Sequence, residues 1–276
     1  MTTTNIDKTV VNGFGDEWER FDQSTLSKKE HFDLFERYFS IFPWELISEK
    51  SVGFDMGCGS GRWAKLIAPR VGTLHCVDPS TALLVARKNL SNLNNCIFHS
   101  SSVDEFSVQS NSMDFGYSLG VLHHIPNTQS ALIDCVDKLK SGAPFLVYLY
   151  YAFDNKPLWF RALFKISNYI RLFVSRLPHT FRYYASQLLA VFIYFPLSRF
   201  SFLLEKLGLN VDKIPLSAYR HSSFYTMRTD ALDRFGTQLE QRFTKIEIEE
   251  MMIAAGLVDI KFNSTIPFWC AVGIKK

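Results

Sequence analysis

The sequence predicts an α/β protein: a doubly wound, mostly parallel seven-stranded sheet with an antiparallel last strand, and a helical cap inserted after the fifth strand. Three observations predict this class. Between residues 50 and 151, apolar runs of strand length alternate with helical stretches, which is the order of a parallel sheet covered by helices. These runs are continuously apolar, as in strands buried on both faces. A helical, aromatic segment then separates them from a closing helix and two strands.

The elements follow in order along the chain. Strands are predicted at 51–56, 73–77, 96–99, 113–119 and 144–151, with helices at 62–68, 81–90 and 129–139. Residues 157–209 are helical in character, punctuated by Pro178 and Pro196, and 215–243 form a polar connection. Thr244 and Glu247 predict a capped helix ending at Gly256, followed by strands at 257–262 and 268–274. The implied parts are an N-terminal helical cover (1–50), an α/β core (51–151), a helical insertion (152–243) and the closing elements (244–276).

Composition excludes several classes of protein. With 47% hydrophobic residues in 276, the chain is neither disordered nor fibrous, and a net charge of +3 disfavours a nucleic-acid-coating protein. Five cysteines without a CxxC motif indicate reduced thiols in a cytosolic protein. Residues 1–7 show no leader, and the apolar stretch 183–198 is shorter than the roughly 20 residues that a membrane span needs. A cytoplasmic protein, soluble or peripheral to the membrane, is expected.

One stretch carries the strongest chemical signal. An apolar strand runs into Asp55, glycines follow at 57, 59 and 61, and a helix begins. Glycines at the carboxyl end of the first strand allow a tight turn and a close approach of the backbone to a ligand. Asp78 ends the second strand about twenty residues later, where an acid can bind both hydroxyls of a ribose.

The spacing is G-x-G-x-G after an acid, not the dinucleotide G-x-G-x-x-G. Here the chain resembles class I S-adenosylmethionine (SAM)-dependent methyltransferases, whose first motif is D/E-x-G-x-G-x-G. The sequence Asp78-Pro-Ser, the segment 111–126 ending in Leu-His-His-Ile-Pro, and the closing Ala-Ala-Gly-Leu before two strands are similar to the same family. A nicotinamide oxidoreductase on the same sheet is the rival that the glycine spacing disfavours.

The resemblance implies a cofactor site. Asp55 and the backbone of Gly57 and Gly59 would bind the methionine part of SAM, Asp78 the ribose, and Leu119 would lie at the sulfur end. Val103 would pack on adenine, and either Ser102 or Asp104 would bind the adenine amino group. The full implied set is Trp18, Asp55, Gly57, Cys58, Gly59, Gly61, Asp78, Pro79, Ser102, Val103, Asp104 and Leu119.

His123 and His124 follow the fourth strand, where the family places its reacting methyl group. A neutral imidazole there can accept the proton of an attacking hydroxyl; alternatively, the pair only packs the loop. Quinone-pathway relatives bind a metal here through Glu-x-x-Glu-His, whereas this chain has Gly120, His123 and His124. No metal is therefore expected.

Trp18 lies in a segment rich in glycine and aromatics, 13–21. In similar methyltransferases an N-terminal segment folds over SAM, where aromatic faces contact the sulfonium. The alternative is a helix that only packs Trp18 and Phe21 on the domain.

The insertion is basic and aromatic. Residues 157–206 hold seven basic residues and one acid, Glu205, which suits either a membrane surface or lipid substrate, or a helical cap or dimer contact. The second interpretation is favoured because no single helical face collects all the basic residues. Further on, His221, Tyr225 and Arg228 are candidates for acceptor binding, because arginine grips carboxylate or phosphate in bidentate fashion; surface ion pairing is the alternative.

The sequence therefore predicts a SAM-dependent methyltransferase acting on a small molecule or sugar-type building block, by O-methylation. A peripheral-membrane lipid or quinone-type methyltransferase and a non-catalytic SAM-binding subunit are the alternatives. The expected partner is a small-molecule acceptor, not nucleic acid; membrane contact through 157–206 and a homodimer are both compatible with the sequence.

Overall fold

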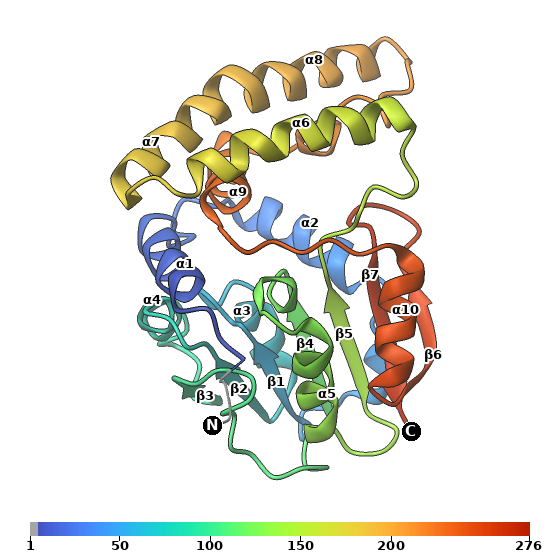
Figure 1. Ribbon diagram of the computed structural model, residues 1–276. Coiled ribbons are helices and arrows are strands. Elements are labelled where there is room, and N and C mark those ends of the chain that lie inside the picture. The colour runs from blue at the N-terminus through green and yellow to red at the C-terminus, as the bar shows by residue number, and fades with distance from the viewer. Residues whose placement is uncertain (1–4) are drawn as a thin grey trace. The chain divides into compact units, whose positions relative to one another are not determined.

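The computed structural model describes residues 5–276. The chain forms two compact units, one of residues 1–22, 33–152 and 239–276, the other of residues 23–32 and 153–238. Residues 1–4, part of the segment in which no leader is expected, lie outside the described residues. Figure 1 shows the path of the chain.

The first unit is built on one seven-stranded sheet in the order β3-β2-β1-β4-β5-β7-β6. The predicted doubly wound, mostly parallel seven-stranded sheet with an antiparallel last strand is confirmed. Its strands are β1 (Val52–Met56), β2 (Thr73–Val77), β3 (Cys96–His99), β4 (Phe115–Leu119), β5 (Pro144–Tyr148), β6 (Leu257–Phe262) and β7 (Cys270–Lys275). β1 to β5 pair in parallel, and β7 runs antiparallel to both β5 and β6. The parallel strands thus end at one edge, where ligands bind in such sheets.

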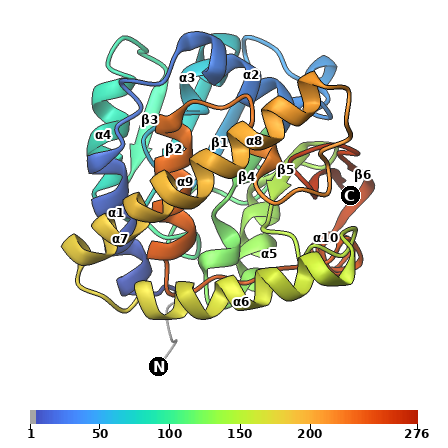
Figure 2. The same cartoon turned by 90° about the horizontal axis from the view of Figure 1, so that it is seen from above.

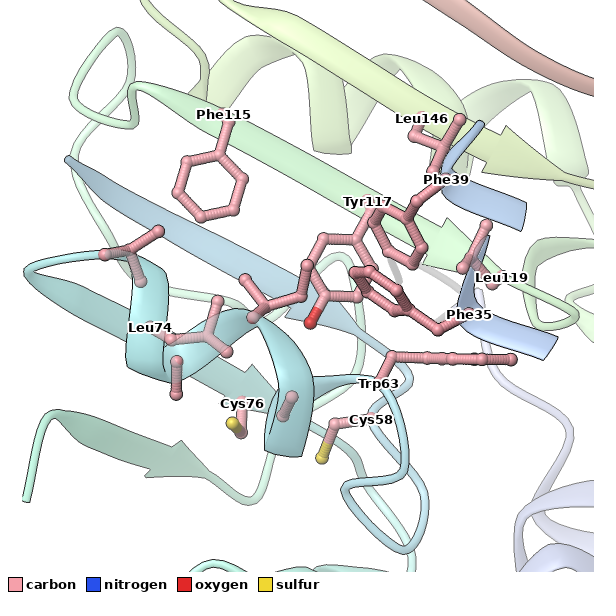
Figure 3. Close-up of a cluster of buried hydrophobic side chains, with 14 of the residues drawn as sticks. Phe35, Phe39, Cys58, Trp63, Leu74, Cys76, Phe115, Tyr117, Leu119 and Leu146 are labelled. Atoms are coloured by element: carbon pink, nitrogen blue, oxygen red, sulfur yellow. The ribbon is translucent and has the colours of Figure 1, made fainter. Parts of the chain in front are cut away.

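Helices cover both faces of this sheet. Residues of α2 (Lys28–Phe39), α3 (Ala64–Ile67) and α4 (Ala82–Asn89) pack on one face, and α5 (Thr128–Lys138) and α10 (Lys245–Ala254) on the other. Figure 3 shows the first core, in which Phe35, Phe39 and Trp63 surround Tyr117. Burying each such ring contributes about 1.5–3 kcal/mol of stability, so this packing fixes the strand ends that bear the site.

Local signals explain several boundaries. Thr244 accepts a hydrogen bond from the Glu247 backbone while the Glu247 carboxylate accepts one from Thr244, which is the predicted capping box of α10. Asn127 caps α5 by accepting from Ser130. Asp7 caps α1 (Lys8–Arg20) in the same way, through Thr9 and Val10. Two short 3-10 turns complete this part of the chain: η1 (Trp44–Leu46) precedes β1, and η2 (Ala68–Arg70) directly follows α3.

The second unit is helical. It contains α6 (Leu158–Val174), α7 (His179–Leu189), the π-helical turn η4 (Ala190–Tyr194), α8 (Phe195–Lys206), the turn η5 (Ser217–Tyr219) and α9 (Phe224–Gly236). Viewed from above, α7 and α8 form one continuous rod, and α6 lies close to it at the α7 end and diverges from α8 (Figure 2). A small core holds the unit together, made of Val174, Ala190, Tyr194, Met227, Ala231 and Phe235.

Three sequence expectations are wrong in this unit. Pro196 does not break the helix, because the wider π-helical turn at 190–194 precedes it and absorbs the missing hydrogen bond. The apolar stretch is consequently longer than expected, since one helix runs from His179 to Lys206, 28 residues. The polar connection of 215–243 contains the 13-residue helix α9, capped by Ser223, which accepts from Thr226. Because α9 buries polar residues as well as apolar ones, its sequence does not divide into an apolar side and a polar side, and the helix was not predicted.

Candidate functional site

The glycine loop follows β1 at the carboxyl edge of the sheet. The backbone amides of Gly57 and Cys58 both donate to the carbonyl of Val77 at the end of β2, at 2.8 and 3.0 Å. Gly57 has φ +77°, and a Cβ there would lie 2.4 Å from the Val121 side chain. Only glycine fits this position, because the conformation is left-handed and the space is already filled. The loop is thereby held against the segment that follows β4.

Asp55 lies near the end of β1, just before the loop, and one oxygen of its carboxyl is unsatisfied in the part of the chain that the structure describes. Its side chain is almost fully buried, and within residues 5–276 its Oδ2 has no hydrogen-bond partner. Burial raises the pKa of Asp55 to about 8, against the opposing effect of the Tyr117 hydroxyl on the neighbouring strand β4. A buried carboxyl without a partner costs stability. That cost indicates a group kept for a ligand, since a cationic ligand would restore its charge and its missing contact.

Asp78 organises the same edge from the end of β2. Its Oδ2 accepts from the Gly59 amide at 2.9 Å, and its Oδ1 accepts from the amide and hydroxyl of Ser80 at 2.9 and 2.6 Å. Burial raises the pKa of Asp78, while the hydrogen bonds from Ser80 and Gly59 lower it. A carboxylate has lone pairs beyond these three bonds. Asp78 can therefore fix the loop and accept further donors at the same time.

Trp18 of α1 lies against the glycine loop. A Cβ added at Gly59 would fall 2.9 Å from the indole Nε1, and the Arg62 guanidinium is 5.7 Å from the Trp18 ring and 4.3 Å from that of Trp63. Phe21 at the end of α1 is buried. The helix therefore packs on the domain and brings Trp18 to the loop. A contact of Trp18 with the cofactor stays a prediction.

The remaining predicted cofactor residues lie around this edge. Ser102 donates to Asp104, which also accepts from the backbone of Asn5, so the two candidates for the adenine contact are joined. Val103 and Leu119 are buried in the two cores. Cys58 is buried on the same side of the sheet as Cys76 (Figure 3), and all five cysteines are unpaired thiols. Gly61 takes a positive φ of 76° before α3, and Pro79 follows Asp78.

His123 and His124 form the turn η3 (Leu122–His124) after β4, and both are buried. The two rings lie 4.0 Å apart, and the His123 ring lies 3.9 Å from that of Tyr150. In the described chain, neither ring nitrogen of His123 has a hydrogen-bond partner. Burial lowers the pKa of His123 well below its usual value, with further lowering by His124 and Arg242. His123 is therefore a neutral imidazole at physiological pH.

A second segment, which sequence reasoning did not assign to the site, clamps this turn. The carbonyl of Leu239 lies 2.7 Å from His124 Nδ1, and the Gln241 amide donates to the His123 carbonyl at 3.1 Å. The Gln241 side chain donates to the carbonyl of Ile125, and the Arg242 guanidinium lies 5.0 Å from the Tyr150 ring.

The three predicted acceptor-binding residues lie in the second unit, each engaged with another segment of it. His221 lies 2.8 Å from Glu205, Tyr225 accepts from the backbone of Gln23 at 2.9 Å, and Arg228 donates to both Gln187 and Tyr183. These contacts account for the side chains as structural links. A role in acceptor binding stays a prediction.

A family model described as a methyltransferase domain matches residues 54–147, from β1 to β5. That range holds the glycine loop, Asp55, Asp78 and both histidines. The chain carries a class I SAM-dependent methyltransferase domain. It is accordingly a SAM-dependent enzyme, with SAM as methyl donor.

Solved structures agree on the fold of this methyltransferase. A chain in the complex of the Haloferax volcanii Trm112 methyltransferase activator with a candidate methyltransferase is similar over 95% of this chain and 97% of that one, with 13% identity and a TM-score of 0.54. A candidate methyltransferase from Bacillus halodurans is similar over 82% and 71%, with 14% identity and a TM-score of 0.50. At such identities the likeness concerns the fold alone. No curated protein matches the sequence.

The residues at the sheet edge fit SAM. Asp55 offers an unpartnered buried oxygen, the glycine loop offers a backbone free of side chains, and Asp78 offers carboxylate lone pairs. These would hold the amino-acid part and the ribose. When bound, SAM supplies an electrophilic methyl group on a sulfonium. Among residues 5–276, no three His, Cys, Asp or Glu side chains are grouped to hold a metal ion.

Replacing Asp78 by alanine should weaken SAM and S-adenosylhomocysteine alike, because both carry the same ribose. The loss of one charged hydrogen bond, about 1–3 kcal/mol, raises Kd by about 5- to 150-fold. Calorimetric titration measures this. Ser80→Ala is the matched control, because it removes a bond to the same carboxylate and leaves the acid in place. Unchanged affinity in a folded Asp78→Ala protein would show that the ribose lies elsewhere.

Proposed function

We propose that the enzyme transfers a methyl group to an oxygen of a small-molecule acceptor, with His123 as the general base. The observation that carries this proposal is the state of His123, which is neutral, fully buried and without a partner on either ring nitrogen among the described residues. Structural histidines in a core normally have a partner, since an unpaired polar group costs about 1–3 kcal/mol. A hydroxyl acceptor needs a base that takes up its proton, and an imidazole nitrogen without a hydrogen-bond partner can do this.

The chemistry asks the protein for three things. The acceptor must be held in line with the methyl group, water must be excluded, and the hydroxyl proton must have a destination as the new carbon–oxygen bond forms. His123 can take that proton at a ring nitrogen and needs no prior deprotonation, because its lowered pKa keeps it neutral. Residues 239–242 bond to the backbone of the turn that carries His123, and the Tyr150 ring packs against the imidazole. An amine acceptor can lose its proton to water after transfer and depends less on such a base.

His124 is the second predicted catalytic residue. Its Nδ1 lies 2.7 Å from the Leu239 carbonyl, and its ring contacts Phe14 of α1 at 4.9 Å. We infer that it positions His123 and does not itself exchange the proton. A sugar-type or other hydroxylated metabolite remains the acceptor class that we propose.

The experiment is transfer of a labelled methyl group from SAM into an extract of the source cell, followed by mass spectrometric identification of the labelled product. The proposal expects a methyl ether on a small molecule, formed by the wild type and not by His123→Phe. A label found on nitrogen, on sulfur, or in protein or nucleic acid would contradict it.

A further inference from the structure

The second unit presents an apolar surface along the rod of α7 and α8. Large apolar side chains recur every three or four residues, on one side of the helix, and are between 53% and 75% exposed. They include Phe181, Leu188, Phe192, Phe200, Leu203 and Leu207. Soluble proteins scatter such residues singly, whereas a continuous row marks a binding surface.

The opposite side of the same rod is small and polar. Ser186, Ala190, Ser198 and Ser201 are fully buried there, and α7 is tied to α9 because Arg228 donates to Gln187 and Tyr183. A helix on the surface of a soluble domain has the reverse pattern, with its apolar side inward. By length and composition alone, the rod could also cross a membrane. Only 22% of its most apolar 18-residue stretch is buried.

α6 repeats the pattern. Leu158, Ile166, Tyr169 and Phe173 are between 61% and 79% exposed and follow each other at helical spacing. Its inward side packs through Val174 and through Arg171, whose guanidinium donates to the carbonyls of Thr237 and Gln238 at the end of α9. Both helices thus rest on α9 and direct their apolar rows away from it.

The charges beside these rows have one sign. Arg161 and Lys165 of α6, Arg176 just after the end of α6, and Lys206 of α8 are exposed. Glu205 is the one acid between 158 and 206, and it bonds to Arg220 and His221 at 2.8 Å each. A second copy of the chain would bring like charges together across this face. An anionic lipid surface instead complements them, because its negative potential attracts basic side chains that lie near it.

We propose that the outer faces of α6 and of α7–α8 dock the enzyme on an anionic membrane surface, with the helices lying in the plane of the interface. The rod does not span the bilayer in this proposal, because its other side is occupied by α9 and by buried polar groups. Apolar residues would enter the boundary between headgroups and acyl chains while the basic side chains contact the headgroups. Trp159 and Tyr169, both exposed, are of the types enriched at that depth.

The sequence favoured a helical cap or a dimer contact for residues 157–206, and we instead assign this segment to a membrane surface. The distribution of basic residues disfavoured a membrane surface, but Arg171 and Arg182 are buried within the unit and belong to no outer face. The basic residues that remain outside flank apolar rows, which the sequence alone could not orient.

Sedimentation with sucrose-loaded vesicles tests the proposal on the full chain. Wild type should pellet with phosphatidylcholine vesicles that contain phosphatidylserine, and less with pure phosphatidylcholine. Phe192→Gln and Leu203→Gln together should reduce binding more than tenfold. Arg161→Glu with Lys165→Glu should remove the preference for anionic vesicles. Leu84→Gln changes an equally exposed leucine of α4, in the other unit, and should change nothing.

Two results would overturn the proposal: wild type that stays in the supernatant with both vesicles, or binding that Phe192→Gln and Leu203→Gln leave intact. Light scattering can give a third contradicting result. If the wild type is a dimer and these substitutions dissociate it, the face binds a second copy of the chain. Thermal unfolding confirms that each variant is folded. SAM titration of the same variants keeps this outcome separate from the proposed reaction, because docking can fail while SAM binding persists.

Discussion

Asp55→Asn is expected to weaken SAM binding by at least about two orders of magnitude and, at the same time, to stabilise the ligand-free protein. The carboxylate is the buried group that faces a cationic ligand, and breaking such a pair costs about 3–5 kcal/mol. In the ligand-free protein the same carboxyl is a liability, because it is buried and its Oδ2 has no partner in the described chain. Asparagine keeps the shape and removes the ionisation.

The dependence on pH follows from the raised pKa. Asp55 has a pKa of about 8 in the folded protein and its ordinary value of 3.8 when unfolded. Between these values the folded state binds more protons, so this group's contribution to the free energy of unfolding falls as pH rises from about 4 to 8. Asparagine does not ionise, so the Asp55→Asn variant lacks this decrease. Its free energy of unfolding relative to wild type should therefore increase with pH up to about pH 8. Urea unfolding at pH 6 and pH 8 measures it.

SAM binding should show the opposite trend. A cationic ligand prefers the ionised carboxylate, so binding releases a proton, and affinity should rise up to tenfold per pH unit until about pH 8. Asp259→Asn, at an exposed position of β6, is the control for both measurements. A variant at Asp55 that binds SAM normally at every pH would remove Asp55 from the site.

His123→Phe is expected to lower kcat by about 10²- to 10⁴-fold, the range for a lost general base, with SAM affinity unchanged. Phenylalanine preserves stacking on Tyr150, whose ring lies 3.9 Å away. It also removes two nitrogens without partners in residues 5–276, so the melting temperature should rise. Steady-state kinetics and thermal unfolding on one preparation test both effects.

The matched variant is His124→Phe. It loses the contact of Nδ1 with the Leu239 carbonyl, so its stability should fall, in contrast to His123→Phe. Because burial holds the pKa of His123 well below 6.5, the wild type should show no loss of kcat from this group between pH 9 and about 6. Turnover by His123→Phe within a few-fold of wild type would show that His123 only packs the turn.

The sequence was sufficient for features that depend on local chemistry. The acid–glycine motif located the loop because its glycines are required by the positive φ and close contact seen at Gly57. Thr244 and Glu247 located a helix start because the capping box lies within four residues. The positions of the strands along the chain followed from the alternation of apolar runs, with strand ends displaced by up to three residues.

Features that depend on tertiary contacts could not be predicted. Tyr150 and Gln241 reach His123 from distant parts of the chain, and no local pattern announces such a clamp. Arg171 is a basic residue turned inward to bond with carbonyls at the end of α9, which only the packed unit reveals. The double role of Asp78, a loop anchor as well as a candidate ribose ligand, likewise appears only when Gly59 is brought beside it.

The central claim is that the edge carrying Asp55, Asp78 and the glycine loop binds SAM. Calorimetric titration of the wild type at pH 8 with SAM, S-adenosylhomocysteine and NADH tests it most directly. We expect one site per chain, similar affinities for SAM and its demethylated product because they share both polar ends, and no binding of NADH. Binding of NADH by a folded protein that gives no heat with SAM would contradict it and assign the edge to a nicotinamide cofactor.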